Sequence, residues 1–149
     1  MSRIFSPAAL FLALSLPFAA LAEARSHQIE GGQVSVPAGV TVQVKTVTVG
    51  EDATTVHLLI SLDTSDTNSV EMAFTENPTL QWGDGQMLHM RQVIGNPNLN
   101  VQNGQTLEGD LVFPGVIPAG VETVNLVFNP GNEGSSIAGP GVTIPLALK

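Results

Sequence analysis

The four-residue segment 87–90 contains Met87, His89 and Met90. Their thioether and imidazole groups are ligands that suit Cu(I). Strand alternation places Met87 and His89 on one face and Met90 on the other, so one strand presents two of the three. His57 or Met72 on neighbouring strands would have to complete the set. Methionine also fills gaps in apolar cores, and we prefer that interpretation. We assign no metal ligand and no cofactor, and keep a periplasmic copper carrier as the alternative function.

The carboxylates of Glu108 and Asp110 lie on one face of a predicted strand, and Glu71 could join them from another strand. Acid–base hydrolysis of glycosides needs two carboxyl groups fixed around a cleft. Acids on the polar face of a half-buried strand are usually its solvated side. His57 is out of phase with the apolar residues of its strand, so we place it on a solvated face without a positioned partner. The chain has no cysteine and no G-x-S-x-G motif. We expect no catalytic residue.

Asp63, Asp66 and Asn68 place oxygen ligands in one polar loop. The loop lacks the glycine and the closing glutamate of a helix-loop-helix calcium site. A capped turn explains the same residues, because Asp, Asn and Ser hydrogen-bond readily to nearby backbone. We therefore interpret this stretch as a turn.

The first 22 residues have the layout of a secretory signal peptide. Arg3 precedes an apolar run over residues 8–16, Pro17 breaks the run, and ALA at residues 20–22 supplies a cleavage site. The run is shorter than the roughly 20 residues that a bilayer requires. We therefore predict a signal peptide at 1–22, a flexible leader at 23–32 and one domain at 33–149, exported to the periplasm or secreted, with no membrane insertion after cleavage.

The remaining chain is acidic. Loss of Arg3 leaves four Lys and Arg residues against 13 Asp and Glu residues, a net charge of −9 with His neutral. The four cations form no cluster, so nucleic acid and anionic lipid surfaces are poor candidates for a partner, and we expect no nucleic acid. A domain of this size folds on its core alone, without disulfides. We expect a protein or cell-envelope component as the partner.

The fold class follows from alternating apolar residues. Leu107, Leu111 and Phe113 alternate with polar residues, and Val124, Leu126 and Phe128 resume the pattern after a Pro- and Gly-containing loop. Similar runs recur along the chain between turn residues, and no window has helical periodicity. About nine short strands at this spacing predict a two-sheet antiparallel sandwich of immunoglobulin-like type, with a closed barrel as the alternative.

Four local expectations refine this prediction. A phase shift of the valines predicts a bulge or a switch between sheets near residues 45–46. A two-residue turn at 84–85 would place Trp82 opposite Met87. A tight turn at 103–104 would invert the apolar face, so a longer or bulged loop is expected there. Pro145 indicates an edge position or a bulge, because proline cannot donate to a ladder.

Residues 83–148 resemble the extracytoplasmic immunoglobulin-like domains of unknown function in bacterial secreted proteins and lipoproteins. In that family a G-x-L-x-F strand precedes a loop and an L-x-F strand, matched here by GDLVF at 109–113 and LVF at 126–128. The resemblance covers about half the chain and implies a sandwich with a binding or structural role and no catalytic residues. The lipid-attachment cysteine of lipoprotein members is absent. A weaker resemblance is to periplasmic copper chaperones, whose H-x-M pattern is absent because His89 and Met90 are adjacent.

Overall fold

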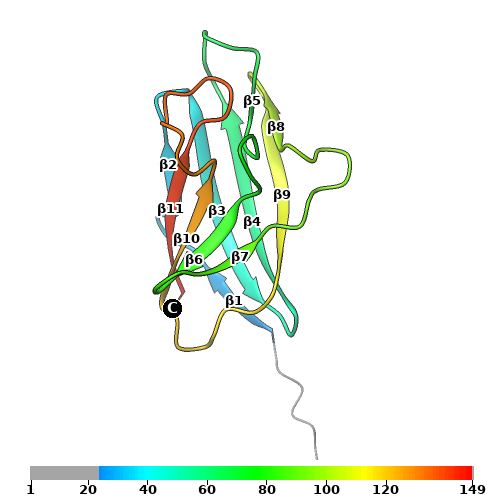
Figure 1. Cartoon of the computed structure of the whole chain (residues 1–149), viewed down its shortest axis with the longest axis vertical. Coiled ribbons are helices and arrows are strands. Elements are labelled where there is room, and N and C mark those ends of the chain that lie inside the picture. Colours follow the sequence, from blue (N-terminus) through cyan, green and yellow to red (C-terminus); the bar gives the residue numbers. More distant parts are fainter. Residues whose placement is uncertain (1–23, 149) are drawn as a thin grey trace, which may run out of the picture.

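The computed structural model describes residues 24–148, and every regular element in that range is a β-strand (Figure 1). The predicted signal peptide, residues 1–22, lies outside the described residues. Eleven strands follow in chain order: β1 (Arg25–Gln28), β2 (Gln33–Ser35), β3 (Val40–Val49), β4 (Ala53–Leu62), β5 (Ser69–Glu71), β6 (Thr79–Trp82), β7 (Gln86–His89), β8 (Asn100–Gln102), β9 (Thr106–Pro114), β10 (Thr123–Phe128) and β11 (Val142–Ala147). The all-β prediction is confirmed for this range, with more strands than the nine expected.

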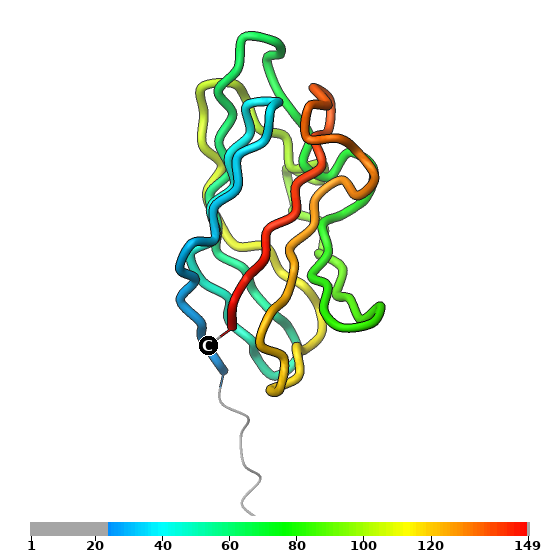
Figure 2. Tube along the Cα trace, turned by 90° about the vertical axis from the view of Figure 1, so that its left-hand side faces the viewer, coloured from blue at the N-terminus to red at the C-terminus, as the bar shows by residue number. Residues whose placement is uncertain are grey.

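The strands form two main antiparallel layers. One sheet has the order β1-β3-β4-β9, with β2 also paired to β3, and the other has the order β11-β10-β6-β7. The short strands β5 and β8 pair with each other. Seen from the side, the two layers face each other (Figure 2). The architecture is sandwich-like and is not a closed barrel.

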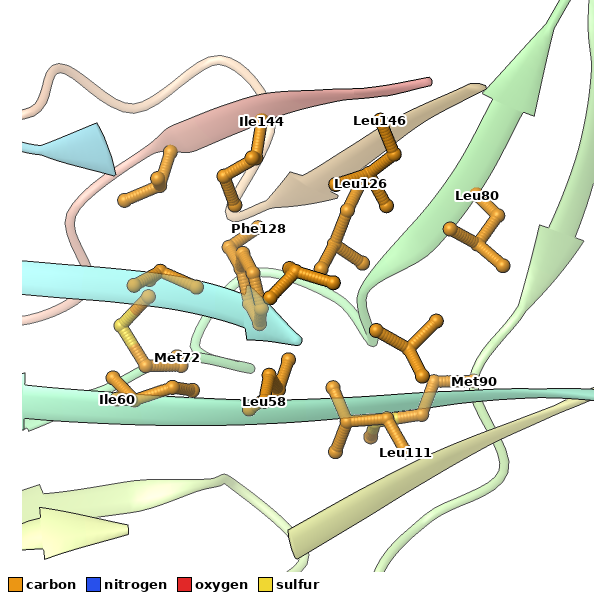
Figure 3. Packing of buried hydrophobic residues seen from close by; sticks show 14 of the residues in the cluster. Leu58, Ile60, Met72, Leu80, Met90, Leu111, Leu126, Phe128, Ile144 and Leu146 are labelled. Atoms are coloured by element: carbon orange, nitrogen blue, oxygen red, sulfur yellow. The ribbon is translucent and has the colours of Figure 1, made fainter. Parts of the chain in front are cut away.

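The core lies between the layers and follows the period-2 pattern of the sequence. Leu58 and Ile60 of one sheet face Leu126 and Phe128 of the other, and all four are at most 1% exposed (Figure 3). Alternate residues of each strand point to opposite faces, so the residues between these apolar positions remain at least partly exposed on most strands. Burial of these side chains is the main favourable contribution to folding.

The predicted irregularity near residue 45 is confirmed as a β-bulge. The register of β3 against β4 shifts between Val44 and Thr46. The shift returns Val47 to the buried face and leaves Lys45 exposed. One extra residue therefore keeps the apolar side chains of a ten-residue strand directed at one core.

The expectation of a flexible leader at 23–32 is wrong for residues 25–28, which form β1 and pair with residues 46–49 of β3. The segment RSHQ has no apolar residue, so alternation of hydrophobic side chains could not reveal this strand. Its Arg25 guanidinium also donates a hydrogen bond to the carbonyl oxygen of Ile117 at 2.6 Å. Backbone pairing and this contact, rather than apolar burial, position β1.

The β6–β7 hairpin differs from the expected two-residue turn. Trp82 faces Gln86 and Gln81 faces Met87, so the loop has three residues, Gly83, Asp84 and Gly85. Both glycines have positive φ angles, 54° and 83°, a region that glycine adopts without strain. The extra turn residue shifts the register by one, which makes the expected pairing of Trp82 with Met87 wrong.

The prediction of a longer or bulged loop at 103–104 is wrong, because the N–H of Gln105 donates to the carbonyl of Gln102 at 3.1 Å and closes a tight turn there. The flanking strands do not form a hairpin, since β8 pairs with β5 instead of β9. The inversion of the apolar face therefore does not arise. Pro145 lies in β11, which ends its sheet, so its missing N–H interrupts no second ladder.

The long connection between β10 and β11 is tied to the sandwich by Asn129, which is fully buried. Its side-chain oxygen accepts from the backbone N–H groups of Phe74 and Thr75, at 2.7 and 3.2 Å. Its side-chain nitrogen donates to the carbonyls of Glu71 and Pro140, at 2.9 and 3.1 Å. The buried amide thereby joins the end of β5, the start of the next connection and the 129–141 loop.

Candidate functional site: the outer edge of strand β9

His57 lies between two carboxylates on the solvent face of the first sheet. Nδ1 of His57 is 2.7 Å from Oδ1 of Asp110, its register partner on β9, and Nε2 is 3.4 Å from Oε1 of Glu108. A carboxylate only accepts hydrogen bonds, so Nδ1 carries a proton. The hydrogen bond to Asp110 raises the pKa of His57 and Glu108 adds a smaller increase, while partial burial opposes both. From the sequence we expected His57 to have no positioned partner, and this expectation is wrong.

The arrangement of these three side chains does not favour metal binding. The two ring nitrogens point away from each other and toward different carboxylates, so the ligands do not converge on one point. Within residues 24–148, no three His, Cys, Asp or Glu side chains are grouped to hold a metal ion. Glu71 lies on β5, where its carboxylate is 3.4 Å from the side-chain nitrogen of Asn98. The structure does not bring Glu71 to Glu108 and Asp110.

The methionine and histidine candidates are also separated. Met87 is 42% exposed and Met90 is 3% exposed, on opposite faces as the alternation predicts. His89 is exposed on β7, whereas His57 is held by Asp110 on the other sheet. Met72 is fully buried and lies in another part of the core from Met90 (Figure 3). Met90 occupies the core, as the preferred interpretation predicts, whereas that interpretation is wrong for Met87, which is exposed.

The loop that contains Asp63, Asp66 and Asn68 is closed by an asparagine from another loop. The Asn103 side chain accepts from the N–H of Thr64 at 3.1 Å and donates to the carbonyl of Thr64 at 2.6 Å. The backbone N–H of Asn103 donates to the carbonyl of Asn68 at 2.8 Å. The capped-turn interpretation therefore describes this loop, with Asn103 as a cap that the sequence pattern did not identify.

The strongest functional candidate is the outer edge of β9. This strand ends its sheet and pairs with β4 alone (Figure 1). The N–H of Arg91 donates to the carbonyl of Val112 at 2.7 Å on the side away from β4. Successive residues of a strand direct their backbone groups to alternate sides, so Glu108 and Asp110 also direct theirs away from β4. Among residues 24–148, no backbone group donates to or accepts from these two residues outside the strand pairing.

Beneath this edge is a small apolar hollow of about 190 Å³. The inward-facing row of β9 reads Leu107, Gly109, Leu111, Phe113. A Cβ added to Gly109 would meet no atom within 4 Å, so the missing side chain leaves space in the row. The walls of the hollow include Leu58, Val93 and Leu99.

A larger hollow of about 500 Å³ adjoins the first and shares Val93 and Asp110 with it. It lies between β9 and the segment 91–94 of the β7–β8 connection, which projects outward beside β9 in Figure 1. Ile94 of this segment is fully exposed. The edge is therefore bordered by hollows with apolar walls and by two carboxylates on its outer face.

Sequence reasoning identified Glu108 and Asp110 but not the role of Gly109 or Val93. The only signal in the sequence was a glycine inside an apolar row, because glycine in a strand marks a place where another group can approach closely. The contribution of Val93 had no signal, since it depends on the path of the β7–β8 connection.

Searches of protein-family models, curated proteins and solved structures return no match for this chain. Residues 24–148 contain no helix that is long and apolar enough to cross a membrane.

Proposed function

We propose that this protein is a non-enzymatic, exported binding module with an immunoglobulin-like topology, which recognises a protein partner through the open edge of β9. Edge strands present unpaired N–H and C=O groups, and an extended segment of another chain can add to them as a further strand. The observation that carries the proposal is the outward-directed, unpaired backbone at Glu108 and Asp110.

The strand orders support the immunoglobulin-like assignment. Immunoglobulin sheets have the orders A-B-E-D and C-F-G. With β3, β4 and β9 taken as A, B and E, and β6, β10 and β11 as C, F and G, the orders β3-β4-β9 and β6-β10-β11 agree with that pattern. Strand D would then lie beside β9. The strand in that part of the chain, β8, pairs with β5 instead. The segment 91–94 donates one backbone hydrogen bond to β9, from Arg91 to Val112, so the edge at Glu108 and Asp110 is left to a partner.

The chemistry of the site supports a binding role. Both nitrogens of His57 face carboxylates, so neither is free to act as a base toward a substrate. The walls of the hollows are mainly apolar, and the outer face of the edge is acidic. Backbone hydrogen bonds supply affinity in strand addition, and pockets for alternate side chains supply specificity. Export is proposed from the sequence of residues 1–22.

A selection from a library of short extended peptides tests this function. The chain after the predicted cleavage, residues 23–149, is the target, and its Asp110→Pro variant is the counter-target, because proline removes an outward N–H and is tolerated at sheet edges. The proposal predicts peptides that bind the wild-type domain, shift the NMR amide signals of Glu108 and Asp110, and lose binding to Asp110→Pro. Circular dichroism and thermal unfolding of Asp110→Pro establish that the variant is folded. Selected peptides that bind both proteins equally would contradict the proposal.

A further inference from the structure

The hollow beneath Gly109 has the size and chemistry of a side-chain acceptor. A cavity of roughly 150 Å³ lined by aliphatic and aromatic side chains accommodates benzene. The hollow at Gly109 is about 190 Å³, and its walls include Leu58, Leu99, Leu107 and Leu111. One phenylalanine or leucine side chain therefore fits, and an aromatic side chain across from a glycine is a known way to stabilise strand pairing.

The register of an added strand directs such a side chain into the hollow. Glu108 and Asp110 direct their backbone groups outward, so an antiparallel strand would form its hydrogen-bonded pairs with those two residues. The residue opposite Gly109 would then belong to a non-hydrogen-bonded pair, in which side chains lie closest. Its side chain points to the same face as the position of Gly109, which is the side of the hollow.

The charges along the edge determine which residues are favourable on either side of the apolar residue of the added strand. Glu108 and Asp110 are exposed on the outer face, and opposite charges across a strand pair are favourable. A second copy of this chain is a poor occupant, because antiparallel self-pairing about Gly109 would place Glu108 opposite Asp110 twice and leave the hollow empty. Like charges directly opposite are destabilising. A strand with basic residues on both sides of an apolar residue satisfies all three positions.

We infer that β9 binds an extended protein segment with the pattern basic–large apolar–basic, in which the apolar side chain, best an aromatic one, fills the hollow at Gly109. The basic side chains lie opposite Asp110 and Glu108 on the outer face. Arg91 and its hydrogen bond to Val112 limit the added strand at one end. This inference rests on the proposed function, since it names the partner class of the same edge.

The test uses a capped seven-residue peptide, Thr-Val-Lys-Phe-Lys-Val-Thr, labelled for fluorescence anisotropy and titrated with the domain. We expect saturable binding. Replacing the central Phe by Ala weakens it at least tenfold, in line with the transfer free energy of a buried aromatic side chain. Replacing both Lys by Glu abolishes it. In the domain, Asp110→Asn or Glu108→Gln weakens binding about twofold to fivefold, whereas Glu122→Gln outside the site changes nothing.

The variant Gly109→Val tests the role of the hollow most directly. A Cβ at Gly109 meets no neighbour, so the variant folds, while its side chain occupies the hollow. We expect at least tenfold weaker binding of the Phe peptide and unchanged binding of the Ala peptide. Gly120→Ala is the matched control, because a Cβ there also meets no atom within 4 Å. Equal affinities of the Phe and Ala peptides, or full binding by Gly109→Val, would overturn the inference.

Different results would overturn the proposed function and the inferred partner class. Library peptides that bind at Glu108 and Asp110 but lack the basic–apolar–basic pattern would overturn the partner class and leave edge binding intact. Library peptides that bind equally to wild type and Asp110→Pro would overturn the proposed function itself. A concentration-dependent dimer in sedimentation that is lost in Asp110→Pro would identify a second copy as the occupant and would also overturn the inference.

Discussion

Nδ1 of His57 lies 2.7 Å from Oδ1 of Asp110, between residues that are register partners on adjacent strands and 53 positions apart in the chain. This pair places an ionisable group beside the edge that we propose as a binding site. It gives the site a pH dependence whose sign can be stated in advance.

The pKa of His57 is predicted to lie above its ordinary value of about 6.5, because the Asp110 carboxylate stabilises the imidazolium. An NMR titration of the His57 ring protons measures it. Asp110→Asn removes the largest cause and lowers the pKa, and Glu108→Gln lowers it less. A wild-type value at or below 6.5, or one that Asp110→Asn leaves unchanged, would contradict the assignment.

The same pair contributes to stability at low pH. A folded-state pKa above the unfolded value means that folding favours protonation, so the contribution is complete below about pH 6.5. It is lost as the pH rises through the folded pKa. The contribution is small because the pair is exposed. Urea unfolding at several pH values should show a shallow loss of stability over this interval that is absent in His57→Gln.

Binding of the basic peptide should weaken on acidification. Protonated His57 adds a positive charge beside Asp110 and reduces the attraction for a basic side chain. Peptide affinity measured across the folded pKa of His57 should therefore fall toward low pH, with a smaller change in His57→Gln. An affinity that rises on acidification would contradict the placement of the basic residues.

Asn129→Leu is predicted to destabilise the domain by about 2–4 kcal/mol, because buried backbone groups lose their partners. The change removes the acceptor for Phe74 and Thr75 and the donor for Glu71 and Pro140. Asn125→Leu on the exposed side of β10 is the control and should change stability by less than about 0.5 kcal/mol. The midpoints of urea unfolding, compared at an unchanged m-value, measure the stability of both variants. Equal effects of the two substitutions would refute the structural role of Asn129.

Two glycine substitutions should have opposite signs. Gly109→Val should stabilise the free domain by about 0.5–1 kcal/mol, because glycine inside a strand is entropically costly and valine favours strands. Gly39→Val should destabilise it by more than about 1 kcal/mol. Gly39 has a φ angle of 90°, and a Cβ there would lie 2.3 Å from the carbonyl oxygen of Asp63. Thermal unfolding of the two variants checks the contrast, and a destabilised Gly109→Val would show that the hollow is not open space.

The sequence predicted most of the framework because alternation is a local property. The valines of β3 and the bulge after Val44 follow from the phase of neighbouring residues. The pairing of His57 with Asp110 could not be predicted, since it depends on which distant strands become neighbours and in what register. Strand β1 was missed for a related reason, because its four residues are polar and its pairing with β3 is long-range.

The hairpin error shows the limit of turn rules. Gly83-Asp84-Gly85 satisfies the signature of a two-residue turn, and it also permits a three-residue loop with two glycines at positive φ. One residue of difference changed every predicted partner between β6 and β7. The hollow at Gly109 could not be predicted from the sequence either, because its walls include residues of β4, β9 and the 93–99 segment.

Amide hydrogen exchange along β9 tests the central claim most directly. In the free domain, the amides of Glu108 and Asp110 should exchange rapidly, while those of Gly109 and Leu111, which point toward β4, should be protected. Saturation with the Lys-Phe-Lys peptide should protect Glu108 and Asp110 and leave the amide of exposed Glu122 unchanged. Protection of all four β9 amides in the free domain, or no added protection at saturation, would contradict an open edge that accepts a partner strand.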